Sequence, residues 1–427
     1  VGIAFVLPSF LIVVALAAIT YSLLGWDYES VTRQMLAYIG FFFFASLYFH
    51  AQLYAERPAR EHAALFYLFV SLGGVVGTMI VSLFAPIVFN DWLEFPLGVM
   101  VAVLGVVICF PAMRYIRDAF ERHVSIIRAC MLFVVASLGI YYAHGVNEGY
   151  FLVDRNFYGV VKLYEGDGER KLYHGTTLHG KQYLDAENAF RPTTYYGIAS
   201  GVGRAIIHEA LRQKDAKTKV NDFKVGAIGL GTGTLASYCA SGDTYVFYEI
   251  DARIERIARD YFSYLANCEG SSVRIGDGRK ILEDELRRGE PQKFDVLAID
   301  AFSDDTIPAH LLTKEAIELY MAHLRDDKSL LVIHTSNRYL SLDPVVVRIA
   351  QELGLASAII YDTGDSETGI GLTSSEWVVI AKDPSVIAEP VFTEAATPVD
   401  EVAPLWTDDY MNILAALSLP AVYTSGY

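Results

Sequence analysis

The first third of the chain consists largely of long apolar stretches, and these restrict its fold more than any other feature. A helix needs about 20 mostly apolar residues to cross the hydrocarbon core of a bilayer. Five stretches meet or approach this length, at 1–24, 35–54, 62–86, 93–113 and 124–143. We therefore predict an α-helical membrane domain over residues 1–149, with the lipid bilayer as its partner.

The remainder has the pattern of an α/β domain, because charged and apolar residues alternate from about residue 150. Strand-like runs at 156–165 and 171–178 predict a small β-rich lobe over residues 150–200. From 201 to 427, strand-like and helix-like segments alternate. Such alternation produces right-handed β-α-β units, so we predict a doubly wound, mostly parallel sheet with helices on both faces.

The charge balance and the cysteine pattern exclude a nucleic acid and a metal ion as partners. The chain has 50 acidic and 34 basic residues, whereas a nucleic-acid-binding surface must be basic. No CxxC pair and no cysteine–histidine cluster at metal-ligand spacing occurs among Cys109, Cys130, Cys239 and Cys268. We predict reduced, packed cysteines, no metal and no nucleic-acid partner. His310 and His334 lack partners at triad spacing and are predicted to be structural.

Glycines and carboxylates directly follow four of the predicted strands. In a doubly wound sheet, ligands bind outside the carboxyl ends of the strands. The loop GLGTG at 229–233 follows the first strand, and the sequence DAFSDD, which begins at Asp300, follows the fourth. Together the four strand ends supply the candidate site residues Gly229, Gly231, Thr232, Gly233, Glu249, Asp251, Asp277, Gly278, Asp300, Phe302 and Asp304.

The glycine loop and the acidic strand ends predict the class of ligand. A Walker-type phosphate loop needs a lysine after its last glycine, and none follows Gly233. A dinucleotide loop needs GxGxxG, but Gly233 comes only two positions after Gly231. Carboxylates would repel phosphates, yet they accept hydrogen bonds from ribose hydroxyls and an adenine amine. We therefore predict S-adenosylmethionine or its decarboxylated form, with Glu249 at the ribose and Asp277 at the adenine.

Several segments resemble motifs of a known family. They are NFYGVVKLYE, LHGKQ, TTYYG, IGLGTGT, YEID, IGDG and IDAFSDD. Through them, residues 150–385 resemble the polyamine aminopropyltransferases, the spermidine synthase family, and the whole chain resembles bacterial membrane-fused spermidine synthase-like proteins. The resemblance implies a Rossmann-like, methyltransferase-type fold, a homodimer, and a cofactor site at Gln182, Gly229, Gly231, Glu249 and Asp277. It also implies that Asp300 is the general base that takes a proton from the attacking amine.

Three positions depart from the family's motifs. Where the family has Tyr-His-Glu in its gate segment, this chain has Tyr195, Tyr196 and Gly197, so a carboxylate that would hold an amine is missing. Thr232 replaces the aspartate that receives the ammonium group of the cofactor. Asp304 is displaced by one position. We predict that Tyr195, Tyr196 and Phe302 shape the substrate pocket, with Asp300, Asp304 and Tyr195 as the catalytic candidates.

The missing carboxylates favour a reaction without a polyamine. In this reading the carboxylate of intact S-adenosylmethionine attacks its own γ-carbon and releases 5'-methylthioadenosine and homoserine lactone, a lyase reaction aided by positioning in a dry pocket. The alternative is an aminopropyltransferase that makes spermidine or a related polyamine. A methyltransferase and a non-catalytic cofactor sensor remain as further alternatives.

The arginines give a conflicting signal on topology. The positive-inside rule places on the cytoplasmic side two loops that contain Arg57, Arg60, Arg114, Arg117 and Arg122. A full fifth span would then put the α/β domain on the opposite side. Arg128 shortens that stretch to about 15 apolar residues, a length typical of interfacial helices. Because the predicted cofactor is intracellular, we expect a multi-pass protein of a bacterial-type inner membrane with a cytoplasmic α/β domain.

Overall fold

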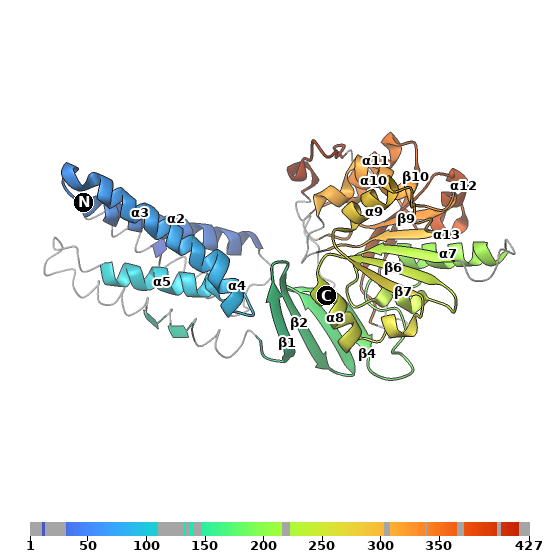
Figure 1. The fold of residues 1–427 in the computed structure, drawn as a ribbon, viewed down its shortest axis with the longest axis horizontal. Coiled ribbons are helices and arrows are strands. Elements are labelled where there is room, and N and C mark those ends of the chain that lie inside the picture. Colours follow the sequence, from blue (N-terminus) through green and yellow to red (C-terminus); the bar gives the residue numbers. More distant parts are fainter. Residues whose placement is uncertain are drawn as a thin grey trace. The chain divides into compact units, whose positions relative to one another are not determined.

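The computed structural model divides the chain into two compact units, Val1–Val160 and Val161–Tyr427. It describes residues 11–12, 31–109, 132–133, 136–137, 139, 147–215, 223–302, 308–337, 340–364, 371–398 and 403–417. Figure 1 follows the chain through both units, and each is described by itself below.

The first unit is built from apolar helices. They are α2 (Val31–Ala55), a 3-10 turn (Arg60–His62), α3 (Ala63–Met79), a π-helical turn (Ile80–Phe84), α4 (Ala85–Val88) and α5 (Glu94–Cys109). By length and composition, Met35–Ala55 and Arg60–Val88 are able to cross a bilayer, and Glu94–Val107 is a shorter apolar helix. The predicted stretches 1–24 and 124–143 lie almost entirely outside the described residues.

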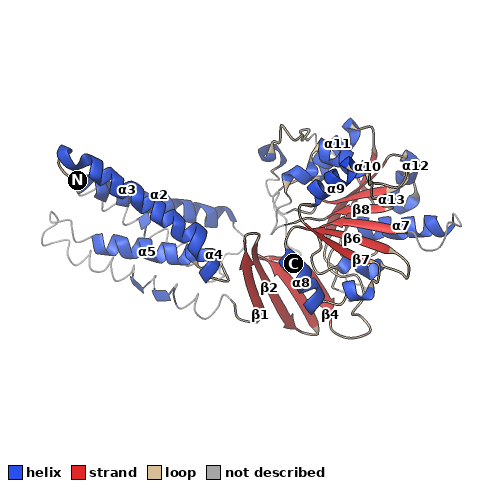
Figure 2. Ribbon diagram, viewed as in Figure 1, coloured by secondary structure: helices blue, strands red, loops and turns tan. Residues whose placement is uncertain are grey.

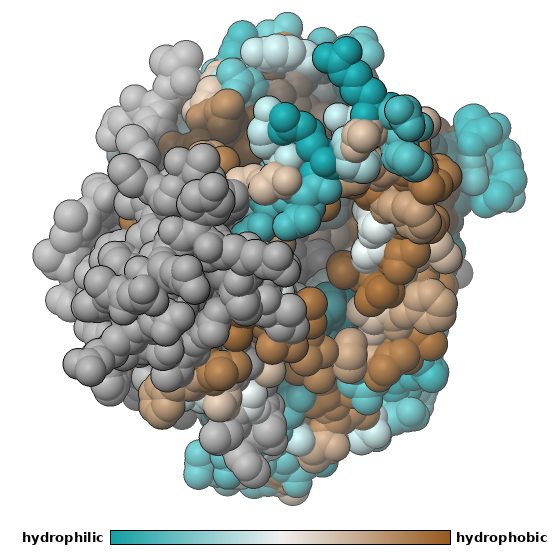
Figure 3. All heavy atoms as spheres, turned by 90° about the vertical axis from the view of Figure 1, so that its left-hand side faces the viewer, coloured by the Kyte–Doolittle hydropathy of each residue, from teal (hydrophilic) through white to brown (hydrophobic). Residues whose placement is uncertain are grey.

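Large apolar side chains cover much of the surface of these helices. Phe42 is 73% exposed, Phe69 63% and Ile87 81%. The face seen in Figure 3 carries many such side chains, drawn in brown. Exposed apolar patches of this kind mark surfaces that contact lipid or another protein, which agrees with the predicted association of this unit with a membrane.

An antiparallel sheet follows the helices. Its strands β1 (Tyr150–Asn156), β2 (Gly159–Gly166), β3 (Glu169–His174) and β4 (Thr177–Tyr183) lie in the order β1-β2-β3-β4. Within the first unit, Arg155 on β1 pairs with Glu94 at the start of α5, with N–O distances of 2.8 and 2.6 Å. Its guanidinium also lies over the Trp92 ring, 4.1 Å from the centroid.

The second unit is an α/β domain around an eight-stranded sheet (Figure 2). The strands are β5 (Lys224–Ile228), β6 (Thr244–Glu249), β7 (Ser271–Ile275), β8 (Val296–Ile299), β9 (Leu330–His334), β10 (Ala356–Asp362), β11 (Ser375–Ala381) and β12 (Ala396–Thr397). Their order is β12-β10-β11-β9-β8-β5-β6-β7. From β7 to β9 the pairs are parallel, as predicted, whereas β11 is antiparallel to both neighbours, so the sheet is mixed.

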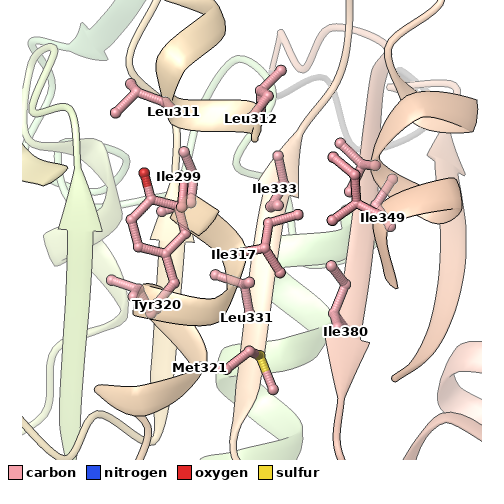
Figure 4. Close-up of a cluster of buried hydrophobic side chains, with 14 of the residues drawn as sticks. Ile299, Leu311, Leu312, Ile317, Tyr320, Met321, Leu331, Ile333, Ile349 and Ile380 are labelled. Carbon is pink, nitrogen blue, oxygen red and sulfur yellow. The ribbon is translucent and has the colours of Figure 1, made fainter. Parts of the chain in front are cut away.

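Helices cover both faces of this sheet. Contacts with β8 to β11 on one face come from α7 (Gly201–Asp215). The other face carries α9 (Gly278–Arg287), α10 (Lys314–Ala322) and α11 (Asp343–Glu352), whose side chains form the main core cluster with alternate strand residues such as Ile299, Leu331 and Ile380 (Figure 4). The remaining helices are α8 (Ala252–Tyr261), α12 (Pro384–Ile387) and α13 (Pro390–Thr393).

Two cysteines are joined, which corrects the prediction of reduced cysteines for this pair. Cys239 and Cys268 form a disulfide, with their Cα atoms 5.7 Å apart. Sequence spacing gave no sign of it, because 29 positions separate the two residues and the fold brings them together. Cytosolic reductants keep most thiols reduced. The oxidation state of this pair in cells therefore reports which compartment the α/β domain occupies.

Reduction of this disulfide is expected to destabilise the α/β domain by about 3 kcal/mol, because the bridge limits the unfolded chain over a sequence separation of 29 residues. The measurement is thermal unfolding of the full chain with and without dithiothreitol. A Cys239→Ser/Cys268→Ser variant is the control, and its midpoint should not respond to the reductant. An unchanged wild-type midpoint would contradict the expected contribution.

Candidate functional site

The glycine loop between β5 and the 3-10 turn Thr234–Tyr238 places its backbone close to neighbouring segments. Gly229, Gly231 and Gly233 have φ angles of +105°, +55° and +81°, which L side chains rarely adopt. A Cβ on Gly229 would overlap the carbonyl oxygen of Asp300. The loop therefore lies directly against the end of β8, and the predicted nucleoside loop and the predicted base are neighbours.

The Thr232 side chain is packed inside the protein. Its side chain is 1% exposed, and its Oγ1 lies 2.7 Å from Oγ1 of Thr234. A Cβ on Gly180, in β4, would overlap the Thr232 side chain, so the sheet of the β lobe packs closely on this residue. In the structure described here Thr232 fills a packed position between the loop and β4.

Glu249 ends β6 beside the glycine loop. Its Oε2 accepts the Leu230 N–H at 3.1 Å and its Oε1 accepts the Asp251 N–H at 3.0 Å. The residue is 9% exposed, and burial raises the pKa of its carboxyl to about 7, although both backbone donors act to lower that pKa. The carboxyl group thus titrates near neutral pH at the place predicted for the ribose.

The acidic residues at the next two helix starts act as N-caps. Asp251 accepts the Arg253 N–H at 2.9 Å and pairs with the Arg253 guanidinium. Both oxygens of its carboxylate are therefore engaged by Arg253. Asp277 caps α9 through the Lys280 N–H at 3.2 Å and is half-buried. Gly278 is buried where a Cβ would press on Ile228, so it permits α9 to pack closely on β5.

Gln182, on β4, joins the β lobe to the segment that follows α8. Its Nε2 donates to the Ala189 carbonyl at 2.8 Å and to Ser263 Oγ at 2.6 Å, and its Oε1 accepts the Ser263 N–H at 3.1 Å. The side chain is 4% exposed. The amide is thereby fixed at the edge of the predicted nucleoside site.

Asp300 lies at the centre of a buried polar network at the end of β8. Tyr196 donates its hydroxyl to Oδ2, and Nδ1 of His334 lies 2.7 Å from Oδ1. The carboxylate and the imidazole side chains are 7% and 6% exposed. Nε2 of His334 in turn lies 2.8 Å from Ser336 Oγ. Burial, followed by the charge of Asp300, raises the pKa of the Tyr196 hydroxyl, which therefore stays protonated and donates to the carboxylate.

Aromatic rings hold His334 in place. Its ring stacks on Trp377, with centroids 4.4 Å apart, and on Tyr195, with centroids 4.6 Å apart. The Phe302 ring makes a T-shaped contact with the His334 ring, with centroids 4.9 Å apart. The predicted pocket residues Tyr195, Tyr196 and Phe302 are thus gathered around Asp300 and His334.

His334 was expected to be a structural histidine without a partner at triad spacing, and the structure places it in contact with Asp300. Its position in the sequence could have indicated this contact, because His334 ends β9, the strand next to β8. Asp304 lies outside the described residues. His310 lies beside Asp277, with Nε2 3.4 Å from Oδ2. Within the described ranges, no group of three or more His, Cys, Asp and Glu residues is arranged to hold a metal ion.

Comparison with known proteins identifies relatives that match part of this chain. The chain is 35% identical over 91 residues to a polyamine aminopropyltransferase of Vibrio vulnificus, which covers 21% of this chain and 29% of the relative. It is 29% identical over 171 residues to polyamine aminopropyltransferase 1 of Hyperthermus butylicus, which covers 37% of this chain and 58% of the relative. The chain thus matches less than two thirds of the length of either relative. No family model matches it.

Solved structures were also compared. A spermidine synthase in complex with the transition-state analogue AdoDATO aligns with 64% of this chain and 85% of its own, at a TM-score of 0.41 and 16% identity. Human methyltransferase-like protein 13 in complex with SAH aligns with 48% of this chain and 93% of its own, at a TM-score of 0.35 and 19% identity. The sequence matches confirm the resemblance to polyamine aminopropyltransferases that the motifs predict.

Proposed function

We propose that the α/β domain transfers the aminopropyl group of decarboxylated S-adenosylmethionine to an amine. The observation that carries the proposal is the buried Asp300 carboxylate, which Tyr196 and His334 hold beside the glycine loop. The relatives named aminopropyltransferases support this reaction over the lyase reaction that the sequence alone favours.

The reaction requires a free amine at the sulfonium-bound carbon. The amine lone pair forms a bond to the methylene carbon next to the sulfur, and the carbon–sulfur bond breaks. Its electrons stay on sulfur, which gives neutral 5'-methylthioadenosine. The new secondary ammonium carries one proton too many, and Asp300 accepts it as general base. The sulfonium is already a good leaving group, so no acid is needed to assist its departure.

In this proposal the nucleoside lies along the ends of β5 to β7. The glycine loop allows close approach of the backbone, Glu249 accepts from the ribose hydroxyls, and Asp277 receives the adenine amine. Gln182, Thr232, Asp251 and Gly278 support this surface through the packing and capping contacts described above. A membrane-embedded helical unit, a cytoplasmic α/β domain and a homodimeric assembly are further parts of the proposal.

The lyase reaction on intact S-adenosylmethionine is the second candidate, and the residues at positions 197 and 232 favour it. Gly197 offers no carboxylate to an amine, and Thr232 is neutral where the family's aspartate would repel the substrate carboxylate. Loss of both negative charges weakens any site for a polycation.

One assay separates the two reactions. Purified protein is incubated with S-adenosylmethionine alone and, separately, with decarboxylated S-adenosylmethionine plus putrescine, and methylthioadenosine and the coproducts are identified by mass spectrometry. The transferase proposal expects an aminopropylated amine in the second mixture only. Methylthioadenosine and homoserine lactone from the first mixture would establish the lyase reaction and overturn the transferase proposal.

Binding of the nucleoside is expected to weaken below neutral pH. Ribose hydroxyls donate to the charged form of Glu249, whose pKa in the free protein is about 7. Binding therefore favours the deprotonated carboxylate, and the affinity for methylthioadenosine should be about tenfold lower at pH 6 than at pH 8. Isothermal titration calorimetry at pH 6 and pH 8 measures this difference in affinity. Glu249→Gln should bind weakly with little pH dependence, and a flat wild-type profile would exclude Glu249 from the ribose site.

A further inference from the structure

The disulfide joins two segments that both contribute to the proposed nucleoside site. Cys239 directly follows the 3-10 turn that continues the glycine loop, and Cys268 directly follows the 3-10 turn Leu265–Asn267. We propose that this pair is a reversible redox site, whose reduction by a dithiol lowers the affinity of the domain for the nucleoside. The proposal rests on the nucleoside site proposed above and adds the regulation of that site.

Backbone hydrogen bonds connect Cys239 to the glycine loop. The Cys239 N–H donates to the Ala236 carbonyl at 3.1 Å, and the Ala236 N–H donates to the Gly233 carbonyl at 2.9 Å. The Gly233 N–H donates in turn to the Leu230 carbonyl at 2.9 Å, and the Leu230 N–H donates to the Glu249 carboxyl. A displacement of Cys239 would therefore move the backbone that holds the group proposed to bind the ribose.

Cys268 is connected in a similar way to Gln182. The Cys268 N–H donates to the Leu265 carbonyl at 3.2 Å. Two residues before Leu265, the N–H and the hydroxyl of Ser263 hold the Gln182 amide. Leu265 also packs on the glycine loop, because a Cβ on Gly233 would lie 3.2 Å from its Cγ. The disulfide therefore ties the glycine loop to the segment that fixes Gln182.

Reduction of the disulfide is expected to loosen the glycine loop without unfolding the segment around Cys268. There the Tyr264 hydroxyl donates to the Lys181 carbonyl at 3.0 Å and to the Arg191 carbonyl at 3.2 Å, and neither contact involves a sulfur. The loop itself contains three glycines, which have the largest conformational freedom to lose. A nucleoside that requires one loop conformation therefore binds less tightly to the reduced protein.

The two sulfurs differ in exposure, which determines how the bond is reduced. Cys268 is 2% exposed, whereas Cys239 is partly exposed. A thiolate of the dithiol attacks the Sγ atom of Cys239, the S–S bond breaks, and its electron pair stays on the Sγ atom of Cys268. The second thiol of the reagent then attacks the mixed disulfide and releases Cys239. The reagent is oxidised to a disulfide, and the protein gains two electrons and two protons.

A sensing role fits a disulfide in a cytoplasmic domain. Cytosolic disulfides are uncommon, and those that occur are usually catalytic or redox-sensing. The proposed transfer reaction uses no thiol, so it requires no catalytic role of this pair. Cellular dithiols supply the reductant in that compartment. The pair therefore couples the redox state of the cytosol to nucleoside affinity.

The test measures the affinity of the full chain for methylthioadenosine by isothermal titration calorimetry, at a temperature well below unfolding. Oxidised protein is expected to bind about fivefold more tightly than protein reduced with dithiothreitol, a typical size for coupling between two sites. Reoxidation should restore the affinity. Cys239→Ser/Cys268→Ser should bind with the lower affinity, whether or not dithiothreitol is present.

A second control distinguishes coupling from a general loss of stability. Gly289→Ala alters a residue that follows α9 and has a φ of +77°, and its new Cβ would meet no atom within 4 Å. This variant loses stability through an unfavourable φ angle and keeps the disulfide. It should therefore bind methylthioadenosine as tightly as oxidised wild-type protein and lose affinity on reduction by the same factor.

Thermodynamic linkage provides a second measurement of the same factor. If reduction weakens nucleoside binding, bound nucleoside must oppose reduction to the same extent. Saturating methylthioadenosine should therefore raise about fivefold the ratio of reduced to oxidised dithiothreitol at which half of the protein is reduced. Thiol alkylation followed by mass spectrometry measures the reduced fraction.

The outcomes distinguish this proposal from the proposed function. Equal affinities of oxidised and reduced protein, or a half-reduction ratio that methylthioadenosine does not change, would overturn the redox site and leave the nucleoside site standing. A response of the serine variant to dithiothreitol would overturn it as well, because the effect would then arise elsewhere. If oxidised protein does not bind methylthioadenosine, the proposed nucleoside site fails, and its regulation fails with it.

Discussion

Asp300→Asn should lower kcat for aminopropyl transfer by about 10²- to 10³-fold, because the amide has no basic oxygen to take the proton from the attacking amine. The amide oxygen still accepts a hydrogen bond from Tyr196, and the glycine loop contacts the Asp300 backbone, which does not change. Affinity for methylthioadenosine should therefore stay within about twofold of wild type. Steady-state rates with decarboxylated substrate and a diamine, together with calorimetric binding, measure both quantities.

The same variant distinguishes the two candidate reactions. Attack by the substrate's own carboxylate releases no proton, so the lyase reaction has no need of a base, and Asp300→Asn should scarcely alter it. Asp383→Asn serves as a control, because this exposed carboxylate caps α12 and has no place in the proposed site. Transfer activity within threefold of wild type in Asp300→Asn would exclude a base at this position.

Gly229→Ala should destabilise the α/β domain by about 3 kcal/mol and abolish nucleoside binding. Two effects add, since the φ of +105° is unfavourable for alanine and the new methyl group would overlap the Asp300 carbonyl. Relief of the overlap requires the glycine loop and the end of β8 to separate, which would displace the Asp300 side chain as well. Thermal unfolding of the full chain and calorimetry with methylthioadenosine are the measurements.

Gly289→Ala is the control that distinguishes the effect of an unfavourable φ angle from the effect of steric overlap. Gly289 has a φ of +77°, but no atom lies within 4 Å of the position that a Cβ would take. This control should lose only about 1 kcal/mol and should bind the nucleoside normally. Similar losses of stability in the two variants would show that the loop and the strand end are not held in close contact.

The positions of the proposed nucleoside-binding residues could be predicted because these residues follow neighbouring strands in the parallel part of the sheet. The glycine loop, Glu249, Asp277 and Asp300 follow β5, β6, β7 and β8, and a β-α-β pattern places all such ends at one edge. The local β-α-β pattern and the right-handed connection between its strands are sufficient to place these residues at one edge. The capping role of Asp251 also has a local cause, but its sequence position beside Glu249 suggested a ligand contact instead.

Other parts of the fold depend on contacts that are distant in the sequence. β11 inserts between β9 and β10, an order that no short motif specifies. The pairing of Cys239 with Cys268 and the packing of Thr232 under Gly180 depend in the same way on how separate segments dock. Periodicity identifies strands and does not fix which strand lies beside which.

The inserted strand also affects the growing chain during translation. The ribosome delivers β9 before the residues 335–374 that precede β11, so β9 has one paired edge and one open edge during this interval. Every residue of β9 is buried in the finished domain. An open apolar strand edge readily pairs with other chains. The nascent protein is therefore prone to aggregation after residue 334 has emerged and before β11 covers this edge of β9.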